Sequence, residues 1–382
     1  MDKQLIRLCR PWMSGEEIAA VRDVLDSGFL TQGPKTEEFE RTVAKYIGTR
    51  YAFATSSCTT ALHLSLAVLG VGPGDDVLVP DFTFPATANV VIQQGARPIL
   101  VDVDPKTYNV DIGDLRKKYT PKTKAVIPVH AFGKPAWMDE INDFAHNAGI
   151  MVIEDAACAL GATYKGRQCG NLGDLGCFSF HPRKIITTGE GGMIATNNAE
   201  LAQKIAILRS HGGIREDSRF RFVAAGFNYR MSDINAAIGV VQMAKVDHLV
   251  HSRRRLADRY REYLGGISVL TLPSDEKESR QTYQSFVVLL QKGIDRDKVI
   301  RKMRESGVET TIGTYALHTE QFFEKNYGYT PGCLPGSYEC ATQGMSLPLY
   351  PHMTEEDMAQ VVSSLKSALH RYDPPSISQT PP

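Results

Sequence analysis

The chain has 382 residues, which is long enough for two domains with sizeable hydrophobic cores. Its 43 basic and 43 acidic residues cancel, so no excess of positive charge points to nucleic acid or to an anionic membrane surface. No run approaches the roughly 20 apolar residues that a membrane helix needs, and Met1–Gln4 begin the chain without the apolar core of a signal peptide.

Apolar runs with the spacing of strands recur through the N-terminal half of the chain and alternate with helical patterns. A helix is expected over 15–27, where Ile18, Val21, Val24 and Leu25 form an apolar face. Strands that alternate with helices predict an α/β fold with a largely parallel sheet and helices on both of its faces. The last two strands are close enough in sequence to form a hairpin. The expected strands lie near 51–55, 76–80, 97–103, 124–130, 150–154, 176–180 and 192–196, and further helices over 59–69, 86–94 and 136–147.

The rest of the chain has the pattern of a smaller α/β domain, which follows a long helical stretch from Ser232 to about Leu264. Arg253, Arg254 and Arg255 lie within this stretch, and we interpret them as a solvated helix face. The last helix is expected to begin after Thr354-Glu355-Glu356-Asp357, which resembles a capping box. The expected units are a large domain over 12–250, a small domain over 251–372 with strands at 284–290 and 308–312 and helices at 295–306 and 355–370, and a disordered tail over 373–382.

Seven cysteines are scattered along the chain without a Cys-x-x-Cys pair. Their number and spacing fit reduced thiols, so we expect a cytoplasmic protein. Cys169 and Cys177 flank a loop, but we expect no metal site. The sequence contains no Walker loop, no complete dinucleotide glycine fingerprint and no Gly-x-Ser-x-Gly elbow.

Lys184 stands between a short apolar run that includes Ser179 and a glycine-rich loop, Thr187–Gly192. A lysine held in such a turn, beside a serine that can bind phosphate, is what an enzyme using pyridoxal phosphate needs. Its amine forms a Schiff base with the aldehyde of that cofactor. The segment alone is only suggestive, because most lysines are solvated surface charges.

Asp155 ends a run, Gly149–Glu154, that has the pattern of a buried strand. Ligands of open α/β sheets bind beyond the carboxyl ends of the strands. A carboxylate beside the pyridine nitrogen would keep that nitrogen protonated, so that the ring can accept electrons. The alternative is that Asp155 simply caps the turn or helix that follows.

Small hydroxyl residues follow the strand expected at 51–55 and precede a helical run that begins near Ala61. The segment Ser56–Thr60 would therefore leave backbone N–H groups free at a helix start, where the helix dipole also favours an anion. This is a weak signal in isolation, since most helices begin with such a cap.

Together these segments resemble the pyridoxal-phosphate-dependent sugar aminotransferases of the DegT/DnrJ/EryC1/StrS family. The resemblance runs from about Pro11 to about His370 and implies a type I pyridoxal-phosphate aminotransferase fold: a large domain with a mostly parallel seven-stranded sheet, and a smaller C-terminal α/β domain. Its motifs occur in the order of the family, at Thr31–Pro34, Ser57–Leu62, Asp81–Thr87, Glu154–Ala157, Phe178–Lys184, Gly226–Met231 and Ser346–Pro351.

The resemblance implies a role for each matching residue. Lys184 would form the Schiff base with the cofactor, and Asp155 would contact its pyridine nitrogen. Phe84 would stack on the pyridine ring, although it could instead be a core aromatic, and Phe82 could be confused with it. The residues implied to hold the cofactor phosphate are Thr59, Thr60 and Ser179.

Asn228 would reach the phosphate bound by a neighbouring subunit, which implies a homodimer with shared active sites; alternatively, it is a turn residue before the next helix. Cys158 departs from the family, which often has glutamine or histidine at this position. A thiol replaces neither hydrogen-bonding group well. The candidate substrate contacts are His181, Arg230, Tyr315 and His318.

The activity that the resemblance implies is a ping-pong transfer of an amino group from glutamate to a nucleotide-linked keto sugar. Lys184 would move the proton, which requires a neutral amine, so we expect its pKa to be lowered. The alternatives are amination of a cyclitol ketone or a related dehydration, a different pyridoxal-phosphate enzyme such as a lyase or cysteine desulfurase, and a non-catalytic relative.

Overall fold

The computed structural model of the chain describes residues 5–217 and 219–372. The tail expected over 373–382 lies outside these ranges. No helix within them is long and apolar enough to cross a membrane.

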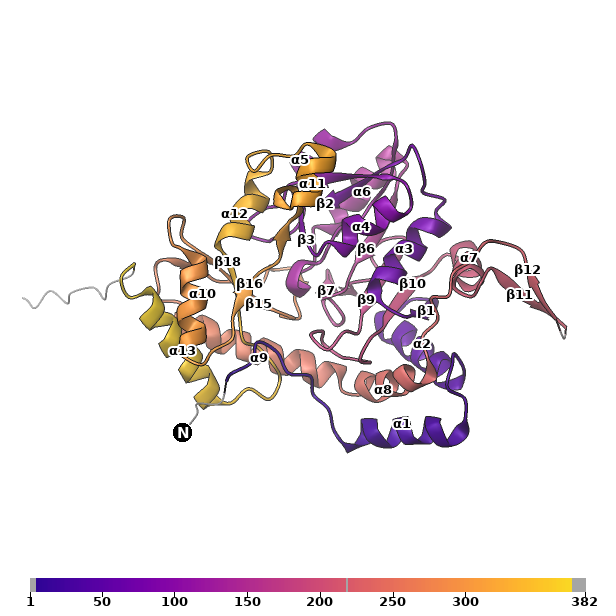
Figure 1. The fold of residues 1–382 in the computed structure, drawn as a ribbon, viewed down its shortest axis with the longest axis horizontal. Helices are drawn as coiled ribbons and strands as arrows, with labels where there is room; N and C mark the ends of the chain where they lie inside the picture. Colours follow the sequence, from indigo (N-terminus) through magenta and orange to yellow (C-terminus); the bar gives the residue numbers. More distant parts are fainter. Residues whose placement is uncertain (1–4, 218, 373–382) are drawn as a thin grey trace, which may run out of the picture.

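A seven-stranded sheet forms the centre of the molecule (Figure 1). Only one of its strands runs antiparallel to its neighbours, so the predicted mostly parallel sheet is confirmed. That strand, β10, pairs with β9, and the expected hairpin is therefore present. The strands in spatial order are β1 (Tyr51–Thr55), β10 (Gly192–Thr196), β9 (Leu175–Ser179), β6 (Met151–Asp155), β5 (Thr123–Val126), β2 (Asp76–Pro80) and β4 (Arg97–Val101).

Helices cover both faces of this sheet because alternate strand residues point to opposite sides. In β2, Leu78 belongs to one apolar core, whereas Val77 and Val79 belong to the other. The first core is closed by α2 (Pro34–Ile47), α5 (Ile112–Lys118), α6 (Met138–Ala148) and α8 (Asp233–Met243). The second is closed by α3 (Cys58–Val68), α4 (Ala86–Gln93) and α7 (Ala199–Arg209).

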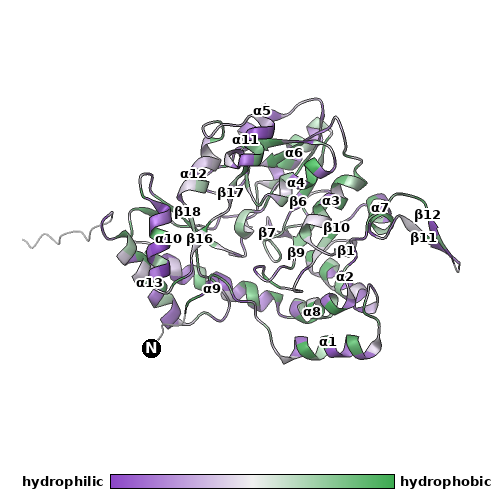
Figure 2. Ribbon diagram, viewed as in Figure 1, coloured by the Kyte–Doolittle hydropathy of each residue, from purple (hydrophilic) through white to green (hydrophobic). Residues whose placement is uncertain are grey.

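A four-stranded antiparallel sheet carries the small domain, with its own apolar core. Helix α9 (Val246–Leu264) joins the two cores: Val246 and Val250 pack with the large domain, and Leu256 and Leu264 with the small one. The change from one core to the other falls between Val250 and Leu256. The sheet consists of β13 (Leu270–Thr271), β15 (Phe286–Leu290), β18 (Gly344–Leu347) and β16 (Thr311–Ile312), and α10 (Arg296–Glu305) packs against α13 (Glu355–Leu369). Hydrophilic stretches mark the outer helices α5, α10 and α13 (Figure 2).

One part of the expected small domain packs on the large domain instead. Strand β17 (Tyr315–Ala316) pairs with β3 (Phe82–Thr83), and Leu317, Phe323 and Leu334 enter the core beside α3 and α4. This segment contains α11 (Gln321–Tyr327) and is followed by α12 (Pro335–Gln343). Residues 251–372 therefore do not form a single packing unit. A separate three-stranded sheet consists of β7 (Thr163–Tyr164), β8 (Arg167–Gln168) and β14 (Ser279–Arg280).

The interpretation of Arg253 as a solvated residue is wrong. Only 1% of its surface is exposed, and its guanidinium donates to the carbonyl oxygens of Gln284 and Leu349, each at 3.0 Å. These carbonyls lie at the same end of the small-domain sheet, one just before β15 and one just after β18, so a buried donor satisfies them where water cannot reach. The expected long helix also divides, since α8 ends at Met243 and α9 begins at Val246.

Two surface features stand out on the large domain. Helix α1 (Gly15–Ser27) has the predicted bounds, but Ile18 and Leu25 on its apolar face are 66% and 54% exposed. The hairpin of β11 (Gly213–Glu216) and β12 (Arg219–Phe222) extends away from the body of the molecule, with Phe222 exposed at 69% (Figure 1).

Glu154 stabilises the loop that leads into β9. Its buried carboxylate accepts hydrogen bonds from the backbone N–H groups of Gly170, Leu172 and Gly173 at 2.6–2.7 Å, and from His130 Nε2 at 2.9 Å. We expect Glu154→Ala to lower the free energy of unfolding by about 3–5 kcal/mol, because it leaves these buried donors without a partner.

Denaturant unfolding measures this change. The matched control is Glu140→Ala, which removes an exposed carboxylate from α6 and should leave the free energy of unfolding within about 0.5 kcal/mol of wild type. Equal losses in the two variants would contradict the role of Glu154.

Candidate active site

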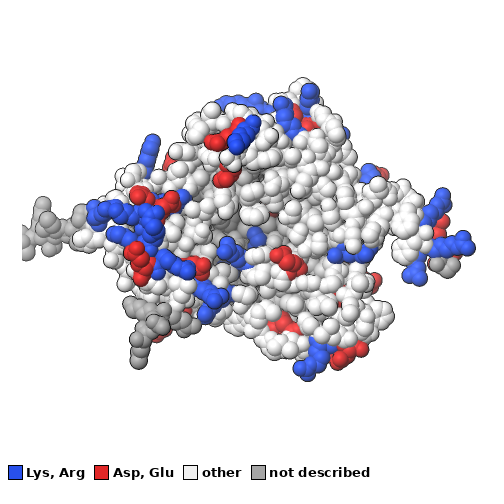
Figure 3. Space-filling model, in the orientation of Figure 1, with Lys and Arg blue, Asp and Glu red and all other residues white. Residues whose placement is uncertain are grey.

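A cavity of about 640 Å³ lies between the large sheet and the small domain. Segments that follow β1, β5, β6 and β9 contribute to its wall. These strands are parallel to one another, so their carboxyl ends meet at one edge of the sheet, where ligands of α/β folds bind. In the space-filling view the middle of the visible face is hollowed, with lysine and arginine atoms beside the hollow (Figure 3).

Lys184 lies in this wall, in the connection between β9 and β10. Its backbone N–H donates to the carbonyl of His181 at 2.8 Å, and the loop closes where the Thr188 N–H and the Thr187 hydroxyl both donate to the carbonyl of Phe180. The Lys184 amine donates to the sulfur of Cys158 at 3.2 Å.

The expected lowering of the Lys184 pKa is wrong for the chain by itself. Burial lowers the pKa of this amine, but Cys158, Cys58 and Asp155 raise it, and the net pKa lies above its ordinary value. The prediction considered only desolvation, whereas the fold gathers three acidic groups around the amine.

Asp155 lines the same cavity at the end of β6. Its carboxylate accepts hydrogen bonds from the Thr87 hydroxyl at 2.9 Å and from the Ala157 N–H at 3.2 Å. The second bond means that Asp155 does cap the following turn while it also faces the cavity. Burial raises the pKa of this carboxyl, with the hydrogen bond from Thr87 acting in the opposite direction.

The loop before α3 has the form of an anion site. Ser57 is the N-cap, and the amide and hydroxyl of Thr60 are both engaged with Ser57 in a capping box. Cys58 and Thr59 are the first residues of the helix, so their N–H groups have no acceptor within it. A Cβ at Gly192 would lie 2.3 Å from the Ser57 backbone, so this glycine allows β10 to approach the loop.

The two phenylalanines before α4 differ in exposure, although both line the cavity. Phe84 is 65% exposed, whereas Phe82 is 1% exposed and packs beside Tyr108 and Phe132. An exposed ring in the wall of a cavity offers a face on which a flat ligand can stack.

These groups fit pyridoxal phosphate. The hydrogen-bond partners of Asp155, Thr87 and Ala157, carry no charge, so a cationic pyridine nitrogen would be the complementary partner for this carboxylate. The same wall supplies the Lys184 amine for an aldehyde, the exposed ring of Phe84 for the pyridine, and the start of α3 with Ser179 for a phosphate. The fold and the cavity thus define a pyridoxal-phosphate enzyme.

The other predicted site residues are placed differently. His181 lines the cavity. Tyr315 is 41% exposed in β17, outside the cavity wall. The prediction for His318 is wrong: its side chain is 0% exposed, with Nδ1 2.6 Å from a carboxylate oxygen of Asp81 and Nε2 3.1 Å from the Pro331 carbonyl. A sugar has no surface of His318 to contact.

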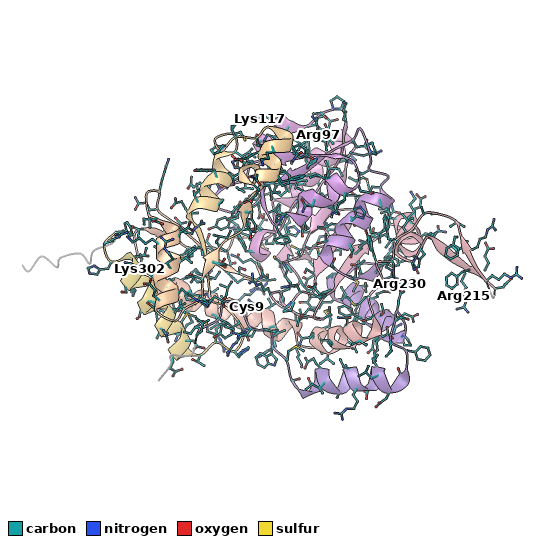
Figure 4. The ribbon with its side chains drawn as sticks, in the orientation of Figure 1. Cys9, Arg97, Lys117, Arg215, Arg230 and Lys302 are labelled. Atoms are coloured by element: carbon teal, nitrogen blue, oxygen red, sulfur yellow. The ribbon has the colours of Figure 1, made fainter. Side chains whose placement is uncertain are left out.

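Asn228 and Arg230 also lie outside the cavity wall. Asn228 forms a β-bridge with Ser210, and Arg230 donates to the Ser210 hydroxyl at 2.9 Å. Figure 4 shows Arg230 well to the right of Cys9, which does line the cavity.

Part of the wall was not predicted from the sequence. The small domain contributes a group of polar side chains, and the N-terminal segment contributes Leu8 and Cys9. Polar residues at the ends of expected strands are a usable signal for the first group, whereas the N-terminal segment carries none. The polar residues of the small-domain wall are Gln284, Ser285, Thr311, Thr314 and Ser346. In the described parts of the chain, no cluster of three or more histidine, cysteine or acidic residues is suited to a metal ion.

Residues 11–366 match the DegT/DnrJ/EryC1/StrS aminotransferase family, and the chain belongs to this family. GDP-perosamine synthase of Caulobacter vibrioides is 38% identical over 372 residues, which cover 96% of this chain and 99% of that protein. The structure of the aminotransferase TlmJ from Streptoalloteichus hindustanus superimposes with a TM-score of 0.90 at 34% identity, over 96% of this chain and 100% of that one. Spr1654 from Streptococcus pneumoniae, in its PLP form, gives a TM-score of 0.91 at 28% identity over 96% and 99%. The protein is therefore a pyridoxal-phosphate-dependent enzyme of a sugar aminotransferase family, as the sequence predicted.

Proposed function

We propose that this enzyme transfers the amino group of glutamate to a nucleotide-linked keto sugar in a ping-pong cycle. The observation that carries the proposal is the joint placement of the Lys184 amine and the Asp155 carboxylate in one cavity of about 640 Å³. The kinship with GDP-perosamine synthase supports a nucleotide-linked acceptor.

Six groups of the wall would hold the cofactor in this proposal. Lys184 would attach the aldehyde, Asp155 would pair with the pyridine nitrogen, and Phe84 would stack on the ring. The phosphate would rest on the N–H groups of Cys58 and Thr59. The Ser179 hydroxyl would join these N–H groups, whereas Thr60 would act through its cap of the loop. When bound, pyridoxal phosphate supplies a reactive aldehyde and a ring that accepts electrons.

The chain's own groups would then perform the proton transfers. The Lys184 amine, once it is not bonded to the cofactor, would take the proton from the α-carbon of the amino donor and return one to the acceptor carbon. The ionised Asp155 would keep the pyridine nitrogen protonated through both half-reactions. His181 and the hydroxyl groups of the small-domain wall would face the acceptor.

We further propose that the enzyme is a homodimer in which each active site receives Asn228 and Arg230 from the other subunit. Both residues lie outside the cavity of their own chain. The apolar residues Ile18 and Leu25 on α1 are exposed, which is unfavourable in an isolated chain and suits a covered face.

Sedimentation velocity should show a dimer for the wild-type protein and a shift toward the monomer for Ile18→Glu, because the charge would be buried in the interface. Asp23→Lys changes a charge on another side of the same helix and should remain dimeric. A monomeric wild type would refute the shared active site.

The decisive experiment for the function is mass spectrometry of reactions that contain glutamate, pyridoxal phosphate and a panel of nucleotide-linked 3-keto and 4-keto sugars. A product with one keto oxygen replaced by an amine would support the proposal and identify the acceptor. If glutamate converts the cofactor but every sugar fails, a cyclitol ketone becomes the acceptor to test. If glutamate leaves the cofactor unchanged, a lyase or a non-catalytic protein replaces the proposed function.

A further inference from the structure

The Lys184 amine has one hydrogen-bond acceptor among residues 5–217 and 219–372, the sulfur of Cys158. The two atoms are 3.2 Å apart, and both side chains line the cavity. They come from different turns at the carboxyl edge of the sheet, because Lys184 follows β9 and Cys158 follows β6. The fold, and not sequence proximity, brings them together.

One segment of the small domain fixes both turns. Just before β15, the Thr282 hydroxyl donates to the Cys158 carbonyl at 2.8 Å, and the Gln284 side-chain amide donates to the carbonyl of Arg183 in the lysine's own turn at 2.8 Å. Gly133 leaves room for the first bond, since a Cβ there would lie 1.9 Å from the Thr282 hydroxyl oxygen. The backbones that carry the amine and the sulfur are therefore held at a defined separation.

We propose that Cys158 is a positioning residue for the reaction: its sulfur holds the Lys184 amine during the part of the cycle in which that amine is not bonded to the cofactor. The inference rests on the proposed function for the role of Lys184. Sulfur is a weak hydrogen-bond acceptor, which suits this role because the amine has to leave the sulfur whenever it moves a proton or bonds the aldehyde.

The effect of Cys158 on the pKa of the Lys184 amine can be distinguished from the effects of the other groups around it. The ionisable groups that face the amine are Asp155 at the end of β6, Cys158 in the turn after it, Cys58 at the start of α3, and His181 in the lysine's own turn. Burial lowers the pKa of the amine, and Cys158 is the leading group that raises it. Without the sulfur the opposition to burial weakens, so the pKa falls and more of the amine is neutral at a given pH.

Competitive acetylation of the cofactor-free, full-length protein tests this inference. Acetic anhydride reacts with the neutral amine only, and peptide mass spectrometry over a pH series gives the midpoint for Lys184. We expect Cys158→Ala to move this midpoint to lower pH and to raise the acetylation rate about fivefold below the wild-type midpoint, as for loss of one hydrogen bond. Cys9→Ala is the matched control, since Cys9 lines the same cavity but its sulfur contacts the Arg183 carbonyl.

Thr282→Val, which removes the hydroxyl that fixes the Cys158 carbonyl, should move the midpoint in the same direction by less. Cys158→Ser, whose hydroxyl can still accept a hydrogen bond from the amine, should keep the midpoint close to that of wild type. If Cys158→Ala does not fold, Thr282→Val decides the question. A midpoint equal to wild type in the folded Cys158→Ala or Thr282→Val variant would overturn the inference. Because no cofactor or glutamate is present, this result is independent of the experiment that tests the proposed function.

Discussion

Replacing Lys184 with alanine should abolish the visible absorption of covalently bound pyridoxal phosphate and lower kcat by about 10²–10⁴-fold or more, the range associated with one acid–base group. Lys184 is the only lysine among the described residues of the cavity wall. No other side chain of the wall therefore offers a primary amine that could replace it. Absorbance spectra after dialysis and the rate of the glutamate half-reaction measure the two losses.

Two further variants complete the test: one keeps the positive charge at position 184 without a primary amine, and the other is a control at a surface lysine. Lys184→Arg keeps a cation but cannot attach an aldehyde, so it should fail in the same way. Lys165→Ala removes a lysine that pairs with Asp139 at 2.6 Å and Glu278 at 3.4 Å on the surface, and it should retain the spectrum and turnover of wild type. Full turnover in Lys184→Ala would refute the proposed role.

Local signals predicted those elements whose ends are fixed by their own residues. Helix α1 has the predicted bounds because Ser14 closes a capping box at its start and Gly28 adopts a left-handed φ of 75° at its end. The packing of Leu317 and Phe323 against the large domain was not predicted. It depends on the pairing of β17 with β3 over two residues, which is too short to produce a periodic pattern in the sequence.

The same distinction applies to the site. Lys184 and Asp155 could be predicted because Asp155 ends one strand of the large sheet and Lys184 lies in the loop after another. The carboxyl ends of these parallel strands meet at the same edge of the sheet. The burial of His318 against Asp81 was not predictable, because it requires knowing how a distant segment docks. Cys9 enters the cavity for a similar reason, since nothing in its own neighbourhood in the sequence marks it.

Asp155→Asn should change stability and activity in opposite directions. Burial raises the pKa of the Asp155 carboxyl, so its ionised form destabilises the cofactor-free fold. This loss of folding free energy is absent below the pKa of Asp155 in the unfolded chain, about 4. It grows as the pH rises through the pKa of Asp155 in the folded protein. Asparagine removes the charge and can keep both hydrogen bonds. Its side-chain oxygen can accept from the Ala157 N–H, and its amide nitrogen can donate to the Thr87 hydroxyl oxygen. The Thr87 hydroxyl can then donate to the Phe84 carbonyl, which is 3.3 Å away.

The asparagine variant without cofactor should therefore have a higher Tm than wild type at about pH 8 and a similar Tm near pH 4. With cofactor, kcat should fall by about 10²–10³-fold, as expected when one electrostatic partner of the transition state is lost. Thr87→Val is the matched control: it keeps the carboxylate but removes a hydrogen bond that stabilises it, so its Tm at about pH 8 should be lower than that of wild type. An asparagine variant with an unchanged kcat would refute the catalytic role, and an equal Tm difference at both pH values would show that packing, not charge, sets its stability.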